Sequence, residues 1–182
     1  MSELERDQDL LREMTPRIAT RLIADVKSDL ADESSKRSCD SILKIAGGLS
    51  EKQSELAAST LDSLLAKTRT GEIKIESLRP ILEQWLQFNS GKPHFKADYT
   101  NLDGAVSPWK KALLSVRLLC NDSDAIATAR AWTLERKLDG ELRKQMFQAV
   151  VKMQPNVASD ALSQLIEDLR QNSKVDVAFR DA

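Results

Sequence analysis

The chain has 182 residues, and its 27 Lys and Arg nearly balance its 28 Asp and Glu, so the formal net charge is -1 at pH 7. It contains 25 Leu and 19 Ala but only 8 Val and 9 Ile, and because helices favour the first pair and strands favour β-branched residues, this composition predicts an all-α fold. It argues against sandwiches, barrels and doubly wound sheets, and the balanced charge differs from that of a dedicated nucleic-acid binder.

Residues 1–88 are expected to form an N-terminal helical part. A short first helix is predicted to end before Pro16, and Thr15 then caps a second helix that has Pro16 in its first turn. The polar run 32–38 is interpreted as a connector. Apolar stripes of helical period predict three further helices, at residues 39–46, 50–67 and 77–88. The glycines at 47–48 favour a left-handed cap at the end of the first of these three.

Residues 89–107 are predicted to be one long loop. The segment collects three Gly or Pro residues and shows no sustained apolar period. It also holds His94 and Tyr99, the only residues of their kinds in the chain, together with Phe95. Long loops in compact domains are usually functional or disordered, so this segment is a candidate for partner contacts.

Residues 108–172 are expected to fold as antiparallel helical hairpins, followed by a frayed tail at 173–182. One of the helices is predicted to extend as far as Leu138. A shift of 33 residues brings the apolar positions of two successive hairpins into partial register. This register favours a HEAT-like or other solenoid arrangement in the second half, while the alternative is two hairpins that merely have similar loops.

The two cysteines are expected to be partly buried, and the three tryptophans are expected to lie in the core, with exposed binding anchors as the alternative for the tryptophans. Cys39 and Cys120 lie far apart, and neither has a second ligand at a metal-binding spacing, so both are interpreted as reduced structural thiols. Trp85, Trp109 and Trp132 each fall on an apolar helical stripe, which predicts core positions. The sequence therefore suggests neither a disulfide nor a zinc site.

The sequence contains no apolar stretch long enough to cross a membrane and no secretory signal pattern at its start. These features favour a cytoplasmic protein without a membrane partner. Export by a specialised secretion system stays open, because such signals have no pattern that can be tested.

Catalytic motifs are missing from the sequence. With His94 as the single histidine, any serine-type triad must include it, and its loop offers neither a nucleophile nor a rigid mount. No phosphate-binding glycine loop, histidine pair or nucleophile elbow occurs. We therefore expect no catalytic residues, no metal and no cofactor. A helical enzyme whose substrate or metal supplies the reactive centre is the remaining alternative.

Basic residues at the start of two helices suggest an interaction surface. Cations at a helix N-terminus oppose the helix dipole, so their presence there calls for an explanation. The expected basic edge comprises Lys110, Lys111, Arg143 and Lys144, extended by Arg136 and Lys137 and reached by Lys92 and Lys96 from the loop. Such an edge suits an acidic protein surface or a phosphate backbone. The simpler interpretation is that long cations cover the apolar stripe and stay solvated.

The leading hypothesis for function is a non-enzymatic protein-interaction module, an adaptor or regulator. It would act through a helical groove and the loop at 89–107, with an acidic protein as one kind of partner. The candidate contact residues are Lys92, His94, Phe95, Lys96, Tyr99, Lys110, Lys111, Arg136, Lys137, Arg143 and Lys144. The alternative is a helical protein associated with nucleic acid through the basic edge.

Overall fold

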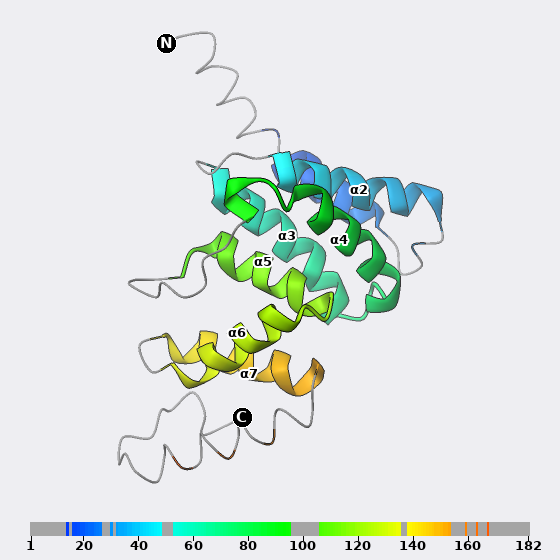
Figure 1. Ribbon diagram of the computed structural model, residues 1–182. Helices are drawn as coiled ribbons and strands as arrows, with labels where there is room; N and C mark the ends of the chain where they lie inside the picture. Colours follow the sequence, from blue (N-terminus) through cyan, green and yellow to red (C-terminus); the bar gives the residue numbers. More distant parts are fainter. Residues whose placement is uncertain are drawn as a thin grey trace, which may run out of the picture. The chain divides into compact units, whose positions relative to one another are not determined.

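The computed structural model describes residues 14, 16–26, 30, 32–48, 53–95, 106–135, 138–153, 159, 163 and 167. Within these residues all regular secondary structure is helical (Figure 1), which confirms the all-α fold. The chain divides into two compact units, Met1–Ala97 with Ser107–Val116 and Asp98–Val106 with Arg117–Ala182. No helix in the described part of the chain is long and apolar enough to span a membrane.

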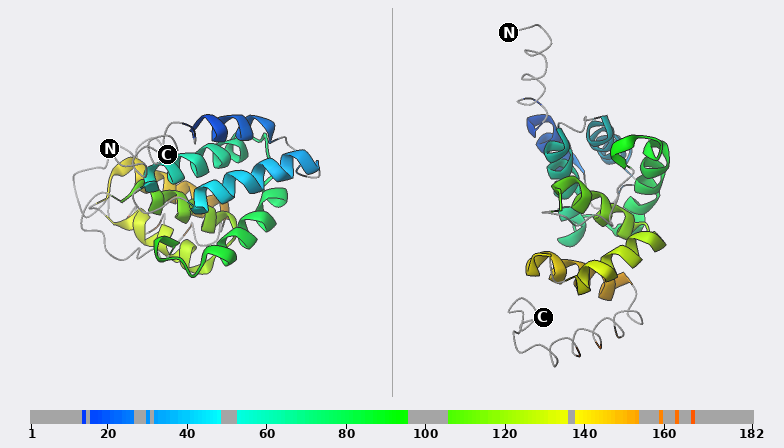
Figure 2. Two further views of the ribbon diagram at one scale, coloured as in Figure 1. Left: turned by 90° about the horizontal axis from the view of Figure 1, so that it is seen from above. Right: turned by 60° about the vertical axis from the view of Figure 1, so that its left-hand side comes forward.

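The first unit contains a helix over residues 16–25, α2 (Glu33–Gly48), α3 (Ser54–Arg69), α4 (Ile75–Asn89), the short 3-10 helix η2 (Pro93–Phe95) and most of α5 (Pro108–Leu119). α2 packs against both α3 and α4, and Figure 2 shows these three helices side by side. The predicted apolar stripes supply fully buried side chains, among them Ile42, Leu61, Leu64 and Leu82. The three stripes predicted from the sequence therefore form the core of this unit.

α2 begins earlier than the sequence suggested. Glu33 is its first residue, so the interpretation of residues 32–38 as a connector is wrong for all but the first of them. The carboxylate of Asp32 accepts hydrogen bonds from the backbone N–H and the hydroxyl of Ser35, both at 3.2 Å. Because this contact satisfies an amide at the helix start, a polar run without apolar period becomes the first turns of a helix.

α2 ends at Gly48 without the expected left-handed cap. Among the described glycines only Gly71 has a positive φ, so Gly47 serves a different purpose. A Cβ atom at Gly47 would lie 3.0 Å from Trp85 Nε1 and 3.1 Å from Asn89 Oδ1. Glycine at this position therefore allows α4 to approach α2 closely.

The second unit is described mainly by a hairpin of α6 (Ser123–Leu134) and α7 (Gly140–Met153). Aspartates start both helices: Asp122 accepts from the N–H of Ala125 at 3.0 Å, and Asp139 accepts from the N–H of Glu141 at 3.0 Å. α6 ends at Leu134, so the prediction that this helix extends to Leu138 is wrong, and Leu138 lies between α6 and α7. Trp132 is buried, as are Trp85 and Trp109 in the first unit, which confirms the core positions predicted for the tryptophans.

Several predicted features lie outside the described residues. These are the first helix, most of the last helix and the tail at 173–182. The hairpin of α6 and α7 is therefore the only complete hairpin described in the second half of the chain. The solenoid arrangement stays a prediction.

Candidate functional site

The described part of the predicted loop is tied down by specific contacts. Lys92 Nζ donates a hydrogen bond to the carbonyl of Gly47 at 2.7 Å, and Trp109 Nε1 donates to the carbonyl of His94 at 2.7 Å. Phe95 is only 1% exposed. Residues 92–95 thus hold α2 and α5 within the first unit, whereas Lys96 and Tyr99 lie outside the described residues.

Four rings form an aromatic cluster, defined here as Trp85, His94, Phe95 and Trp109. The Phe95 ring centroid lies 5.0 Å from that of Trp85 and 5.3 Å from that of Trp109, both in edge-to-face geometry. Such contacts add to the stabilisation from burial alone. Trp85 also donates from Nε1 to the carbonyl of Leu43 at 2.7 Å. The indole of Trp85 is therefore fixed against α2 by both packing and hydrogen bonding.

The expected basic edge loses one of its members. Arg143 is 5% exposed, and its Nε donates to the carbonyl of Thr133 at 3.0 Å, so its guanidinium links α7 to the end of α6. Lys144 in the same unit and Lys110 in the first unit are partly exposed, and Lys111 is exposed. Arg136 and Lys137 lie outside the described residues. Among the described residues of the expected edge at these helix starts, the cations with solvent access are therefore Lys110, Lys111 and Lys144.

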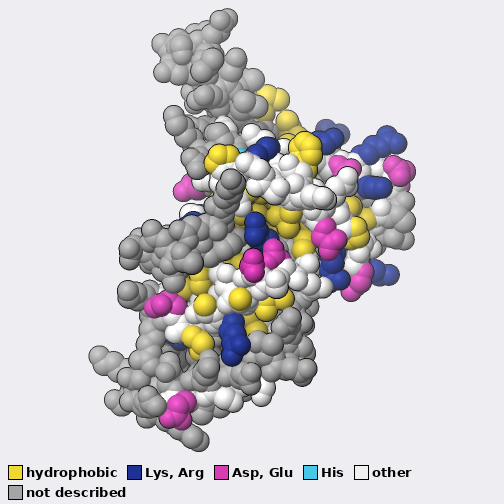
Figure 3. All heavy atoms as spheres, in the orientation of Figure 1, with side chains coloured by type: hydrophobic (Ala, Val, Ile, Leu, Met, Phe, Trp, Pro, Cys, Tyr) yellow, Lys and Arg dark blue, Asp and Glu magenta, His cyan; other side chains and the backbone are white. Residues whose placement is uncertain are grey.

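The described surface carries mixed charges. On the face shown in Figure 3, Lys and Arg side chains are interspersed with Asp and Glu, and apolar side chains lie between them. Burial raises the pKa of the Asp62 carboxyl on α3, and the positive charges of Arg69 and Lys111 oppose this rise. Among the described residues on this face, the charges do not form an extended surface of a single sign, which would favour phosphate backbones.

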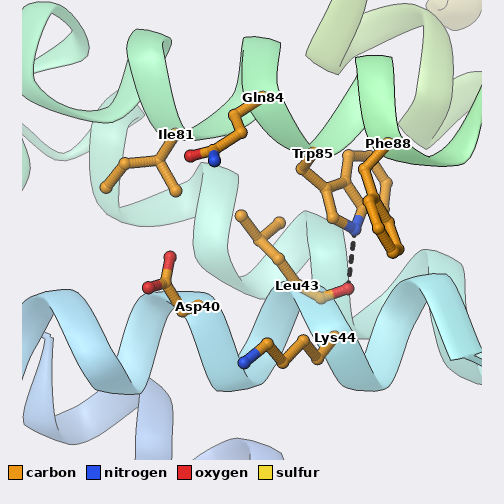
Figure 4. Close-up of a pocket in the computed structure, with 7 residues that line it drawn as sticks. All are labelled: Asp40, Leu43, Lys44, Ile81, Gln84, Trp85 and Phe88. Atoms are coloured by element: carbon orange, nitrogen blue, oxygen red, sulfur yellow. Dashed lines mark hydrogen bonds between the residues drawn. The ribbon is translucent and has the colours of Figure 1, made fainter.

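The first unit has a groove between α2 and α4. It has a volume of about 320 Å³ and is shown in Figure 4. The residues that line it are Asp40, Leu43, Lys44, Ile81, Gln84, Trp85 and Phe88. Leu43 and Trp85 are almost fully buried and form its base, whereas Phe88 is 83% exposed. The groove therefore combines a rigid apolar base with a large apolar side chain in solvent.

The groove follows from the helical spacing of α4. Leu78, Leu82 and Trp85 are buried on the side of the helix that faces the core. Ile81 and Phe88 are seven residues apart, which is close to two helical turns, so both lie along a neighbouring face that borders the core stripe. This second face gives α4 an apolar edge that the core does not cover.

The polar residues of the groove come from α2 and α4. Asp40 and Lys44 are one turn apart on α2, and neither forms an ion pair with another described residue. Gln84 is exposed on α4. Cys39 lies next to Asp40 but is fully buried, and burial together with the Asp40 charge raises the pKa of its thiol to about 12. The Cys39 thiol is therefore protonated at neutral pH and is a poor nucleophile.

The lining of the groove provides apolar, charged and hydrogen-bonding groups for a ligand. No cluster of His, Cys, Asp and Glu that could hold a metal occurs in the described part of the chain. The lining offers one carboxylate, one amine and one amide around an apolar base. These groups can pair with charges and hydrogen-bonding groups of a ligand while its apolar side chains are buried.

The sequence predicted a helical groove but not its position. The candidate residues named from the sequence included none of its lining residues, because attention fell on the loop and on the basic residues. The available signal was Phe88, an aromatic residue outside the inward stripe of its helix.

No protein-family model, no curated protein and no solved structure matches this chain.

Proposed function

We propose that this protein is a non-enzymatic helical interaction module that binds a short apolar segment of a partner protein in the groove between α2 and α4. The observation that carries the proposal is Phe88, the most exposed large apolar side chain among the described residues. It stands beside the buried Trp85 on the rim of a groove. An aromatic side chain at such a place is typical of binding hot spots.

The energetic argument concerns the surface that a partner covers. Burying a Phe side chain contributes roughly 1.5–3 kcal/mol. Because the aromatic cluster and the Leu43 hydrogen bond hold Trp85 in place, little conformational freedom is lost at the base of the groove on binding. The groove is thus preorganised for an apolar ligand, with Asp40 and Lys44 available to fix its register.

The proposed contact surface is the groove and not the loop predicted at residues 89–107. Lys92 bonds to Gly47 and Phe95 packs on Trp85, while His94 packs on Phe95, so these three residues support the groove through internal contacts rather than meeting the partner directly. The alternative of nucleic-acid association rests on Lys110, Lys111 and Lys144, since Arg143 is buried.

The test is a selection from a randomised library of helical peptides against the full chain. We expect enrichment of peptides with a large apolar residue, and loss of their binding to a Phe88→Asp variant. An Ile18→Asp variant is the matched control, because Ile18 is also exposed, at 43%, and does not line the groove. Both positions are exposed, so both variants should fold as the wild type does by circular dichroism.

Two outcomes contradict the proposal. One is the enrichment of peptides that bind wild type and Phe88→Asp equally well. The other is retention of single-stranded nucleic acid with affinity that falls steeply with salt, while no peptide is enriched, because binding through phosphates is strongly salt-dependent and binding through an apolar groove is not.

A further inference from the structure

α2 and α4 run in the same direction along the groove. Trp85 Nε1 bonds to the carbonyl of Leu43, and one turn further along both helices Gly47 lies against Asn89. Figure 4 shows Asp40 across from Ile81 at the other end. The groove therefore has two distinct ends, an Asp40 end nearer the N-termini of both helices and a Phe88 end nearer their C-termini.

The Asp40 end carries a carboxylate without a partner among the described residues. In Figure 4 this carboxylate points away from the α2 axis into the space toward α4. Lys36 and Lys44 lie one turn to either side on α2, and neither forms an ion pair with Asp40. A cation on a bound ligand can pair with such a carboxylate. The attraction between the two charges is stronger there than in open solvent, because the ligand excludes water from the pair.

The Phe88 end is apolar. Ile81 and Phe88 are seven residues apart, so at a rise of 1.5 Å per residue the two ends are separated by about 10 Å. A helix lying in the groove between two packed helices spans the same distance with residues i and i+7. One face of such a helix can therefore place an apolar side chain at Phe88 and a cation at Asp40.

The helix dipoles favour one direction for this ligand. The dipoles of α2 and α4 are parallel, so a third helix is better placed antiparallel to both. In that direction the ligand passes the Phe88 end first and the Asp40 end later. The cation then lies toward the C-terminus of the ligand helix, where its own dipole also favours a positive charge.

From these points we infer that the partner segment is an amphipathic helix with a large apolar residue at position i and a Lys or Arg at position i+7. It lies antiparallel to α2 and α4, with the cation against Asp40. This inference rests on the proposed function and specifies its ligand. It also assigns a basic residue to the partner at this place, where the sequence had suggested an acidic partner for the basic edge.

The experiment compares two peptides of about 20 residues, long enough to form a helix, and of identical composition. One has Phe at i and Lys at i+7, and the other has these two residues exchanged. Each is titrated against the full chain by fluorescence anisotropy. We expect the Phe-first peptide to bind about two- to fivefold more tightly, the range of a partly exposed charge pair.

Two variants test the role of Asp40. Asp40→Asn should remove the difference between the peptides and leave the affinity of the Lys-first peptide unchanged. With Asp40→Lys, peptides that carry Glu in place of Lys should be compared. The Phe-first peptide of this pair should again bind more tightly than the Glu-first peptide. Glu55→Gln is the matched control, because Glu55 is exposed on α3 and does not line the groove.

The outcomes separate this inference from the proposed function. Equal binding of both peptides that is lost in Phe88→Ala keeps the groove and overturns the ordered ligand. The same holds if Asp40→Asn weakens both peptides equally. The proposed function itself fails if neither peptide binds and the library peptides bind wild type and Phe88→Asp equally well. Self-association of the chain that Phe88→Asp abolishes assigns the groove to a second copy and overturns the partner helix.

Discussion

Trp85 links the core of the first unit to the groove. Its indole is 7% exposed, donates a hydrogen bond to the carbonyl of Leu43 and packs edge-to-face on Phe95. Trp85 also forms part of the base of the groove, beside Phe88. The position of Trp85 depends on Gly47, since the two helices are close enough that a single Cβ matters.

Gly47→Ala should lower the free energy of unfolding. The added Cβ would meet Trp85 Nε1 at 3.0 Å, and Trp85 cannot move without losing its hydrogen bond and ring contacts. We expect a net loss of about 1–2 kcal/mol, after subtracting the roughly 1 kcal/mol that Ala gains over Gly in helix propensity. Urea denaturation measures it.

Gly48→Ala is the matched control, because nothing lies within 4 Å of a Cβ at Gly48. This substitution should leave stability unchanged or raise it by up to about 1 kcal/mol. Equal effects at the two glycines would contradict the close approach of α2 and α4.

Asp62 makes stability depend on pH. Desolvation raises the pKa of its carboxyl above the ordinary value of 3.8, against the opposing charges of Arg69 and Lys111. A raised pKa in the folded state means that the ionised form destabilises the fold. This cost is absent below pH 3.8, develops as the pH rises through the raised pKa and is complete at neutral pH.

Asp62→Asn should therefore raise the melting temperature at neutral pH and leave it unchanged below pH 3.8. The melting temperatures of variant and wild type across this pH range are the measurement. A lower melting temperature of the variant at neutral pH would mean that the attraction to Arg69 and Lys111 exceeds the desolvation cost.

At the scale of elements, α2 is held at its C-terminal turns by groups from outside the helix. The carbonyls of Leu43 and Gly47 accept hydrogen bonds from Trp85 and Lys92. The last carbonyls of a helix lack partners within the helix, and a cation near them also complements the helix dipole. The segment after α4 therefore contributes to holding the end of α2, although it has no apolar period of its own.

Lys92→Met should reduce the free energy of unfolding by about 1–2 kcal/mol, since it removes a charged hydrogen bond to the end of α2. Lys74→Met is the control, because Lys74 is exposed at the start of α4 and its side chain makes no cap hydrogen bond. Chemical denaturation of both variants is the measurement. Similar losses for the two would show that the Lys92 contact does not hold α2.

The elements differ in how far the sequence predicts them. Apolar stripes predict the cores of α2, α3 and α4 well, because burial follows the helical period. The start of α2 at Glu33 was missed because it depends on a side-chain cap and not on apolar residues. The approach at Gly47 was misread because a glycine near a helix end fits a left-handed cap as well as a close contact between helices.

The candidate site was the least predictable feature. Phe95 and His94 were rightly singled out as unusual, but their contacts are internal to the first unit. A groove exists only where two helices meet, so its lining residues have no common signature along the chain. Phe88 indicates a binding groove only because it is exposed and lies beside residues of α2, and neither feature can be read from the sequence.

At the scale of the whole molecule, the balanced net charge and the mixed charges on the face shown in Figure 3 fit an interaction through shape and a few specific charges. The first unit buries Trp85 and Trp109, the second buries Trp132, and each unit has its own helix caps. The proposed partner surface lies in the first unit: it is the groove between α2 and α4 and does not include the lysines of α5 and α7.

The most direct test is a map of backbone amide chemical shifts in the full chain during titration with a library-selected peptide. We expect the largest shift changes at residues that line the groove, namely Asp40, Lys44, Ile81, Gln84 and Phe88. Phe88→Asp should abolish these changes. Changes confined to Lys110, Lys111 and Lys144, with the groove residues unaffected, would contradict it.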